Sequence, residues 1–242
     1  MKIVIDTHTH SVASGHAYST ISEIAMAARK RRLKGFVITE HGPALQGFPH
    51  VYYFGNINIL PLKLHNVRLY RGVELNIMDS SGEVDLNHRY LRPLDFVMAG
   101  LHEACFLPQS ESENTAALTA AIANPFVDAI SHPGNPEFPV NYETVVRAAV
   151  SAGKALEINN SSFRVRKGSE ANCRTIVRLA KRYGALLCCG SDAHFAADAG
   201  NFKYALELIH EEGIHADQVI NSSVARFEYF SSCRKQARLG AC

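Results

Sequence analysis

Two histidines stand at the end of a strand-like segment at the start of the chain. Residues 3–5 are Ile-Val-Ile, a β-branched run typical of a buried strand, and they lead into His8-Thr9-His10. Side chains alternate between the two faces of a strand, so His8 and His10 project to the same side at its C-terminal end. Two imidazoles held in this way form half of a metal site. Taken alone, the same residues also fit two surface histidines on an edge strand.

The same arrangement recurs along the chain: an apolar run of strand length ends in His, Glu, Asp or Asn and is followed by a loop. The predicted strands, each given with the polar residue that follows it, are 36–39 (Glu40 and His41), 67–73 (Glu74), 96–101 (His102), 127–131 (His132), 155–158 (Asn159) and 185–189 (Asp192 and His194). Helical patterns separate them near residues 21–32, 111–123, 141–152, 169–180, 201–212 and 223–233. We also expect a short helix near residues 57–64 and a small hairpin around 79–82.

This alternation predicts one parallel sheet with helices on its outside. Polar residues at nearly every C-terminal strand end indicate that the sheet closes into a TIM-type α/β barrel with one shared active face. The alternative is an open doubly wound sheet, which would place its ligands at a single switch point. With 242 residues, of which 47% are hydrophobic, the chain is long enough to form a single domain over residues 1–242.

The composition limits the classes of binding partner and the cellular location that we expect. The formal net charge is only +2, which does not predict a nucleic-acid footprint and leaves small anionic substrates open. No signal-peptide pattern and no run approaching about 20 apolar residues is found, so we expect a cytoplasmic protein without a membrane partner. The cysteines form no C-x-x-C pair, and we expect them to be reduced and mostly buried: Cys105, Cys173, Cys188, Cys189, Cys233 and Cys242.

Nine side chains with metal-binding atoms lie at strand ends or in the first loop. They are His8, His10, His16, His41, Glu74, His102, His132, Asp192 and His194. A catalytic ion takes about three or four protein ligands, so this number predicts two or three ions, with a carboxylate such as Glu74 free to bridge. Neutral imidazoles with few carboxylates favour zinc, although manganese or iron also fits mixed nitrogen and oxygen sites. The remaining histidines are interpreted as ordinary residues.

The ordered motifs resemble those of the polymerase and histidinol phosphatase (PHP) superfamily, and most closely its small bacterial phosphatases of YcdX type. They are His8-Thr9-His10, Thr39-Glu40-His41-Gly42-Pro43, Gly72-Val73-Glu74, Gly100-Leu101-His102, Ser131-His132-Pro133-Gly134-Asn135-Pro136, the run from Glu157 to Phe163, and Gly190-Ser191-Asp192-Ala193-His194. The resemblance covers essentially the full chain. It implies a distorted seven-stranded barrel and a trinuclear zinc phosphatase.

The resemblance also implies how the ligands divide. One zinc ion would take His8, His10, Glu74 and Asp192, a second would take Glu74, His102 and His132, and a third would take His16, His41 and His194. Glu74, Asp192 and His194 are the expected catalytic residues. Glu40 departs from the Asp that relatives often have before the histidine, which adds a methylene beside a ligand.

Such a cluster suits hydrolysis of phosphate monoesters, because a metal-bound water ionises near neutral pH and paired ions clamp the attacking and leaving oxygens. Arg164, Arg166 and Lys167 lie just before the helix opened by Ser169 and are the predicted substrate-binding residues, although a solvent-facing basic loop would have the same sequence. Asp6 and Asn159 are expected to orient ligands. The predicted partner is a small phosphorylated substrate, and the resemblance implies a homo-oligomer, with a trimer as the expected form.

Three other functions share parts of this pattern. A metal-dependent amidohydrolase commonly bridges its metals with a modified lysine at a strand end, whereas Lys154 begins its predicted strand. A PHP-type phosphodiesterase or nuclease would hydrolyse diesters or nucleic-acid ends better than monoesters. A metal-storage protein would have no catalytic use for open ligand positions at the strand ends.

Overall fold

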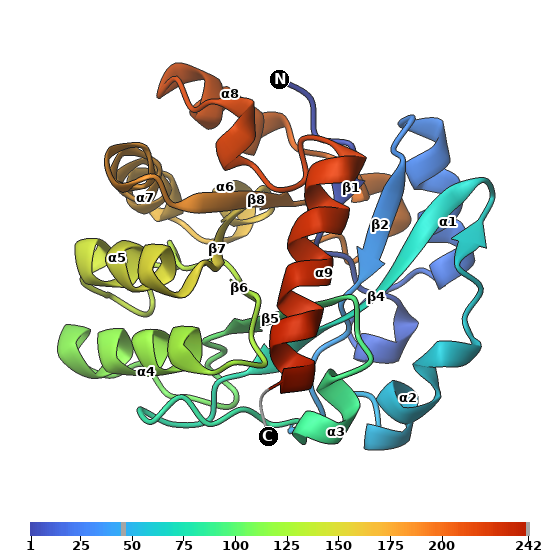
Figure 1. Ribbon diagram of the computed structural model, residues 1–242, viewed down its shortest axis with the longest axis horizontal. Helices are drawn as coiled ribbons and strands as arrows, with labels where there is room; N and C mark the ends of the chain where they lie inside the picture. The colour runs from blue at the N-terminus through green and yellow to red at the C-terminus, as the bar shows by residue number, and fades with distance from the viewer. Residues whose placement is uncertain (45–46, 241–242) are drawn as a thin grey trace.

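Seven parallel strands form a nearly closed barrel in the computed structural model, which describes residues 1–44 and 47–240 (Figure 1). The strands follow one another around the barrel in the order β1 (Ile5–Asp6), β2 (Gly35–Ile38), β4 (Val67–Asn76), β5 (Phe96–Gly100), β6 (Ala129–Ile130), β7 (Ala155–Asn159) and β8 (Leu186–Gly190). Each pair of neighbours along this order is parallel. The short β3 (Lys63–Leu64) pairs antiparallel with β4 outside the barrel order.

The barrel closes between its last and first strands through a backbone bridge and the side-chain contacts of one asparagine. Thr9 forms a parallel bridge with Ala193, just after β1 and β8 have ended. Deeper in the seam, the buried Asn221 amide donates to the carbonyl oxygens of Ile5 and Cys189 at 2.8 and 2.7 Å. These links confirm the predicted closed barrel and rule out the open doubly wound sheet.

Helices cover the outside of the barrel, as Figure 1 shows. They are α1 (Ile21–Lys30), α2 (Val51–Asn56), α3 (His88–Leu91), α4 (Glu111–Ala123), α5 (Tyr142–Ala152), α6 (Ser162–Val165), α7 (Ser169–Tyr183), α8 (Lys203–Glu211) and α9 (Val224–Gly240). Local sequence explains their starts: Thr20 and Glu23 form a reciprocal capping box on α1, and Ser110 and Glu113 form another on α4. The helices pack apolar stripes against the strands, which buries one large core.

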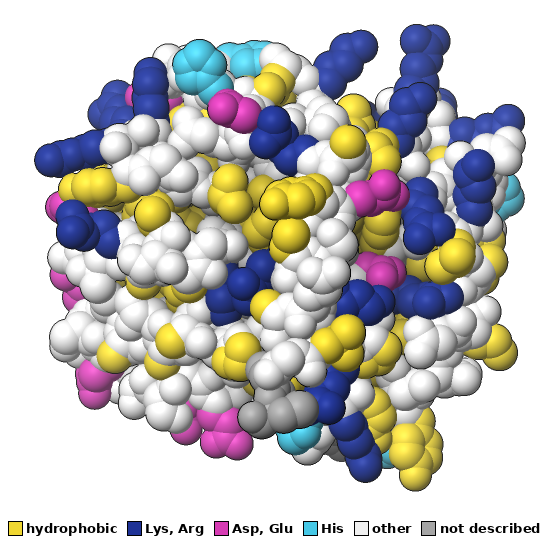
Figure 2. All heavy atoms as spheres, viewed as in Figure 1, with side chains coloured by type: hydrophobic (Ala, Val, Ile, Leu, Met, Phe, Trp, Pro, Cys, Tyr) yellow, Lys and Arg dark blue, Asp and Glu magenta, His cyan; other side chains and the backbone are white. Residues whose placement is uncertain are grey.

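Helix α9 lies across the end of the barrel where the strands begin (Figure 1). Its Phe227 and Phe230 pack against interior residues such as Ile5 and Phe96 and fill this end. Figure 2, in the same view, shows hydrophobic side chains gathered along both sides of the helix. The N-terminal end of the barrel is therefore packed and covered, which leaves the C-terminal strand ends as the face for chemistry.

Two elements differ from the sequence-based expectation. Helix α9 continues to Gly240, beyond the predicted end at 233, because the buried Arg238 donates to Asp128 and to the Leu94 carbonyl oxygen and so anchors the last turns. Residues 57–64 form a 3-10 helix (Ile57–Ile59) followed by β3, not one helix. Pro61 accounts for this break, since the residue before a proline is pushed into extended geometry and Leu60 has ψ 133°.

Other expectations are confirmed. Ile77 and Val84 form an antiparallel bridge around a turn in which Gly82 has a φ of 77°, which is the predicted hairpin. The five described cysteines are free, and Cys173, Cys188 and Cys189 are buried; Cys242 lies outside the described residues. Within residues 1–44 and 47–240, no helix has the length and apolar character needed to span a membrane.

Candidate metal centre

The structure brings all nine predicted ligands to the C-terminal end of the barrel. His8 and His10 follow β1, His41 follows β2, Glu74 lies on β4, His102 follows β5, His132 follows β6, and Asp192 and His194 follow β8. Of the nine, His16 lies farthest along the chain from the end of its strand, after the 3-10 helix Val12–Ser14. Because parallel strands end on the same side of the barrel, ligands that are far apart in sequence meet in one cluster.

Four ligand side chains form the first group. His8 Nε2 and His10 Nε2 lie 2.9 Å apart, and they lie 3.1 and 3.4 Å from Glu74 Oε2. Asp192 Oδ1 lies 3.5 Å from His8 Nε2 and 3.4 Å from His10 Nε2. These four side chains are the set that the family resemblance assigned to one ion.

The second group shares the other oxygen of Glu74. His102 Nε2 and His132 Nε2 lie 3.2 and 2.9 Å from Glu74 Oε1, and they lie 3.2 Å from each other. One carboxylate therefore directs each of its oxygens to a different group of imidazoles, as expected of a bridging ligand.

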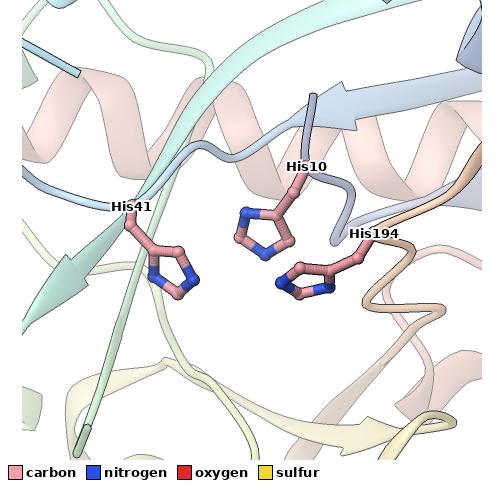
Figure 3. Close-up of side chains that lie close together, drawn as sticks. All are labelled: His10, His41 and His194. Atoms are coloured by element: carbon pink, nitrogen blue, oxygen red, sulfur yellow. The ribbon is translucent and has the colours of Figure 1, made fainter. Parts of the chain in front are cut away.

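The three predicted members of the third group do not all lie in contact with one another. His16 Nε2 lies 2.7 Å from His194 Nε2, but the His41 ring centroid lies 6.4 Å from that of His194. His41 instead places Nδ1 3.2 Å from Glu74 Oε2 and stacks on His10 at 4.5 Å between ring centroids. Figure 3 shows the rings of His10, His41 and His194 turned toward a common space, and one ligand atom from each lies within 4.8 Å of the other two.

The spacing of these atoms fits metal coordination. Zinc–nitrogen and zinc–oxygen bonds of about 2.0–2.1 Å in a tetrahedron place ligand atoms about 3.3–3.4 Å apart. The separations in the first group run from 2.9 to 3.5 Å, and those of the second group are similar. His41 Nδ1 is moreover buried without a hydrogen bond, although it lies near Glu74. An imidazole lone pair that is buried without a partner is costly unless a cation takes it up, so these residues fit divalent metal ions.

The opposite ring nitrogens of most of these histidines have hydrogen-bond partners. Nδ1 of His8 lies 2.8 Å from Glu157 Oε1, Nδ1 of His10 lies 3.1 Å from Ser14 Oγ, Nδ1 of His102 lies 2.7 Å from Asn76 Oδ1, Nδ1 of His16 lies 2.9 Å from the Ser14 carbonyl oxygen, and Nδ1 of His194 lies 3.1 Å from the Asp192 carbonyl oxygen. Such contacts fix ring orientation and leave Nε2 free to bind a metal.

The carboxylates of the centre are held in their ionised form. Burial raises the pKa of Glu74, but the surrounding histidines, His8 foremost, outweigh burial and hold this pKa well below its usual range. Burial also raises the pKa of Asp192, but His8 and His10 outweigh burial and hold this pKa well below its usual range. The two buried negative charges therefore remain available to compensate cations.

Three imidazoles are held neutral, which is the form that binds a metal. Burial, followed by the charge of Arg166, lowers the pKa of His132 to about 4. Burial, followed by His10, lowers the pKa of His194 to about 4. Burial also holds the pKa of His41 well below its usual value.

His10 behaves differently because it lies between carboxylates. Burial lowers its pKa, but its contacts with Asp192 and Glu74 outweigh burial and raise the pKa to about 9. Here a proton serves as the cation between imidazoles and carboxylates. A metal ion bound at this place would compete with that proton.

Two ligands occupy the left-handed backbone region that residues other than glycine rarely adopt. His132 has a φ of 32° and Asp192 a φ of 54°. Each such conformation costs on the order of 1–3 kcal/mol and persists only where surrounding contacts enforce it. Here the backbone N–H of His132 donates to Glu157 Oε2 at 2.9 Å, and that of Asp192 donates to the His8 carbonyl oxygen at 2.9 Å. The strain thus falls on residues that supply ligands.

A pocket of about 240 Å³ opens beside the histidines. It is lined by His16, His41, Phe48, Leu101, His102, Glu103, Ala104, Asn135, Glu137, Phe138 and Arg166. Of the three basic residues predicted to bind substrate, Arg166 lines it, with Nη1 donating to Ser162 Oγ at 2.8 Å and lying 3.5 Å from Asp192 Oδ2. Arg164 pairs with Asp198 at 3.0 Å, and Lys167 is exposed; neither is among the described residues that line the pocket.

The two predicted orienting residues lie next to the ligands. Asp6 accepts the backbone N–H groups of His8 and Ser191 at 3.3 and 2.9 Å. Asn159 Nδ2 donates to Asp192 Oδ2 at 3.1 Å. Both therefore hold the segments that carry ligands, as expected.

Sequence reasoning assigned no role to several further residues of the centre. Glu157 lies within the quoted motif, and its position two residues before Asn159, on the same face of β7, was the signal that pointed inward. Asn76 has the same relation to Glu74 on β4. Glu40 turns its carboxylate to Ser11, Ser14 and the Tyr53 hydroxyl instead of to the ligands.

The chain matches one known protein family along most of its length. The family model described as the PHP domain matches residues 6–236. A protein of Acetivibrio thermocellus named "Probable phosphatase" is 47% identical over 236 residues, which cover 98% of each chain. Another with that name from Thermoanaerobacter sp. is 48% identical over 238 residues, covering 98% of this chain and 97% of the relative. A third, from Vibrio parahaemolyticus, is 44% identical over 99% of this chain and 97% of its own.

A solved structure shares the architecture. The histidinol phosphate phosphatase of Lactococcus lactis, solved with zinc, L-histidinol and phosphate, superposes with a TM-score of 0.67. The superposition covers 89% of this chain and 95% of that one, at 21% identity. The superposition shows a common fold, and at this identity it shows the fold alone.

Proposed function

The chain belongs to the PHP domain family, and from this premise we propose that it is a metal-dependent phosphatase that hydrolyses phosphate monoesters at a trinuclear zinc site. The observation that carries the proposal is the convergence of ligand atoms on Glu74. Imidazole nitrogens of five histidines lie within 3.4 Å of its two oxygens. The name "Probable phosphatase" of relatives that match along nearly their whole length supports the reaction class.

The residues divide among the ions as follows. His8, His10, Glu74 and Asp192 would hold the first ion, and Glu74, His102 and His132 the second. His16, His41 and His194 would hold the third, with His41 turning from its place beside Glu74. Glu74, Asp192 and His194 are the ligands assigned a part in catalysis. Zinc fits a donor set dominated by neutral imidazole, and manganese or iron is the alternative.

Divalent metal ions supply a water that ionises near neutral pH and positive charge that neutralises phosphoryl oxygens. The chain's own residues position the substrate. Arg166 presents its guanidinium to the pocket beside Asp192 and would bind a phosphate oxygen through the donors that Ser162 does not use. Asn135 offers a further polar side chain on the pocket wall. Arg164 and Lys167 would meet only the part of a substrate that extends beyond this pocket.

The reaction class is tested by comparing two chromogenic substrates. Purified protein is assayed with p-nitrophenyl phosphate and with bis(p-nitrophenyl) phosphate, before and after treatment with a chelator and then with zinc added back. The proposal predicts faster hydrolysis of the monoester, its loss on chelation and its recovery with metal. Faster hydrolysis of the diester would instead support a PHP-type phosphodiesterase acting on nucleic-acid ends.

Two further properties belong to this proposal. We expect the protein to act in the cytoplasm on a small phosphorylated substrate, with residues 1–242 as one phosphoesterase domain. The homo-oligomer implied by the family resemblance, a trimer, is measured by size-exclusion chromatography with light scattering.

A further inference from the structure

Glu157 lies inside the barrel, in the middle of β7, and its side chain is fully buried. A buried carboxylate is costly unless donors surround it. Here polar groups reach it from three segments: His8 Nδ1 lies 2.8 Å from Oε1, while the His132 backbone N–H and Asn159 Nδ2 donate to Oε2 at 2.9 and 3.1 Å. The carboxylate therefore touches the first and second ligand groups without being a ligand in either.

The neighbouring strand is shaped to leave room for this carboxylate. A Cβ atom at Gly190 on β8 would lie 2.1 Å from Glu157 Oε1 and 2.5 Å from the His8 Cβ. Only glycine fits at this position while Glu157 and His8 keep their contact. The space that Glu157 fills is thus built from three strands and is not an incidental gap.

We propose that Glu157 is a positioning residue that fixes His8 in one ligand group and His132 in the other through the two oxygens of one buried carboxylate. The inference rests on the metal centre of the proposed function. The His132 N–H and Asn159 Nδ2 both donate to Oε2, so the carboxylate is the acceptor in this network. Nδ1 of His8 then carries the proton toward Oε1, and Nε2 would present its lone pair to the metal. The opposite tautomer would place a proton at the coordinating nitrogen.

The second oxygen acts on the backbone. His132 adopts a φ of 32°, and its N–H donates to Glu157 Oε2. This bond holds the strained residue in the orientation that brings His132 Nε2 within 2.9 Å of Glu74 Oε1. Asn159 extends the same network to the first group, since its Nδ2 also donates to Asp192 Oδ2.

Glutamine cannot replace this carboxylate, although it has the same shape. Every partner of Glu157 is a donor, whereas a glutamine amide offers one accepting oxygen and one donating nitrogen. If its oxygen faces His132 and Asn159, its NH2 group faces His8 Nδ1 and selects the tautomer with the proton on Nε2. If it turns over, two donors meet at the His132 backbone. Either orientation damages one of the two ligand groups.

The first test uses the wild-type protein loaded with zinc. Two-bond ¹H–¹⁵N correlation spectra of the protein labelled at histidine report which ring nitrogen carries the proton and which binds the metal. The proposal predicts Nε2 coordination and a protonated, slowly exchanging Nδ1 for His8. Coordination through Nδ1, or a protonated Nε2, would overturn it, and no variant needs to fold for this result.

The second test compares Glu157→Gln with Asp128→Asn by zinc titration and by the absorption spectrum of the cobalt-loaded protein. Asp128 is an equally buried carboxylate that accepts from Val97 N–H and Arg238, away from the ligands. Loss of such an orienting partner typically costs about 10- to 100-fold in metal affinity. We predict this loss and an altered cobalt spectrum for Glu157→Gln only. Wild-type zinc affinity in Glu157→Gln, or an equal loss in Asp128→Asn, would contradict the inference.

These readouts are independent of turnover. If wild-type protein binds zinc but hydrolyses neither chromogenic ester, the proposed function fails, and the histidine spectra and affinities still decide the role of Glu157. If the wild-type protein hydrolyses the monoester and Glu157→Gln keeps its zinc affinity, the proposed function stands and this inference fails.

Discussion

Among single residues, Glu74 has the largest number of partners in the centre. Its Oε2 lies 3.1–3.4 Å from His8, His10 and His41, and its Oε1 lies 2.9–3.2 Å from His102 and His132. The side chain is 1% exposed, so solvent cannot replace it. The two oxygens place Glu74 in direct contact with ligand atoms of both groups.

Glu74→Gln should therefore lower the content of more than one ion. The amide removes the negative charge that compensates the cations and replaces one coordinating oxygen with a donor. Metal analysis of the purified variant should show a loss of more than one equivalent and little remaining activity. His16→Ala, which removes a ligand from one group only, is the matched comparison. Full metal content and full activity in Glu74→Gln would show that the carboxylate does not bridge.

Of the nine predicted ligands, His16 lies farthest along the chain from the end of its strand, and it is exposed. Loop residues are held less rigidly than strand ends, so the group containing His16 should bind its ion most weakly. We predict that His16→Ala keeps the fold and two ions but lowers kcat by about 10²- to 10³-fold, the usual cost of one electrostatic stabiliser. Excess zinc should restore little, because the ligand itself is missing. Wild-type turnover with only two ions bound would remove the third ion from the mechanism.

Lys154 provides a prediction away from the metal centre. Burial, followed by the nearby charge of Arg234, lowers the pKa of Lys154 to about 7, while Asp128 opposes this effect. Below pH 7 the buried ammonium is charged in both states and destabilises the fold. Between pH 7 and about 10.4 the unfolded chain binds the extra proton, so this contribution raises the stability as the pH rises.

The test compares wild-type protein with Lys154→Met by urea unfolding at several pH values. Buried thiols such as Cys188 have a raised pKa and lower the stability in part of the same range, so only the difference between the two proteins is informative. A tenfold change in a proton-binding constant corresponds to about 1.4 kcal/mol of stability. Lys154→Met should be the more stable protein at pH 6.5, with its advantage shrinking toward pH 9.5. An advantage that does not change with pH would contradict the lowered pKa.

The sequence predicted which side chains offer metal-binding atoms, but it did not predict which residues contact those side chains. Histidines at the ends of strands are conspicuous because strand parity and position predict where they point. Glu157 and Asn76 contact His8 and His102, but their spacing along the strands predicts only that they point inward, not which histidine each one meets. Their partners come from other strands, so only the assembled barrel identifies them.

Among elements, β8 and β1 are joined by the Thr9–Ala193 bridge and by Asn221, whereas the other neighbouring strands pair as ladders. Asn221 supplies hydrogen bonds that a strand pair would otherwise make. Its Nδ2 donates to the Ile5 and Cys189 carbonyl oxygens, and its Oδ1 accepts the Cys189 N–H at 3.1 Å. A single buried amide thus completes the ring of strands.

Asn221→Ala should destabilise the protein by about 3 kcal/mol, since buried backbone groups left without partners cost about 1–3 kcal/mol each. For a chain of this size, this loss lowers Tm by roughly 6–12 °C. Asn201→Ala is the control, because Asn201 is only half-buried and its contacts of 3.4 and 3.5 Å are longer. Calorimetry checks both variants. Equal, small shifts would show that Asn221 does not hold the seam.

Element boundaries were predicted where local chemistry defines them. The helices expected near residues 21–32 and 111–123 begin after caps at Thr20 and Ser110. The helix expected near 57–64 was wrong, because Pro61 breaks it. The last turns of α9 had no such signal, because the residues after 233 are mostly polar. They are helical because Arg238 reaches Asp128 inside the fold, a contact between residues 110 positions apart.

For the whole molecule, the two ends of the barrel have separate roles. Helix α9 fills the N-terminal end with Phe227 and Phe230, whereas the C-terminal end carries the nine predicted ligands. The closed barrel and its active face could be predicted because polar residues follow nearly every strand. The position of His41 could not, because it depends on how neighbouring rings stack: its ring lies on Phe48 at 5.0 Å and on His10 at 4.5 Å.

The central claim is that several metal ions bound by this cluster carry the phosphatase activity. The most direct measurement is the metal content of purified protein, determined together with its p-nitrophenyl phosphatase activity while zinc is removed by a chelator and then returned stepwise. Nine predicted ligands, one of them a shared carboxylate, predict two to three equivalents of zinc or manganese, and activity that returns only as the second and third equivalents bind. Full activity in protein that holds less than one equivalent would contradict the account.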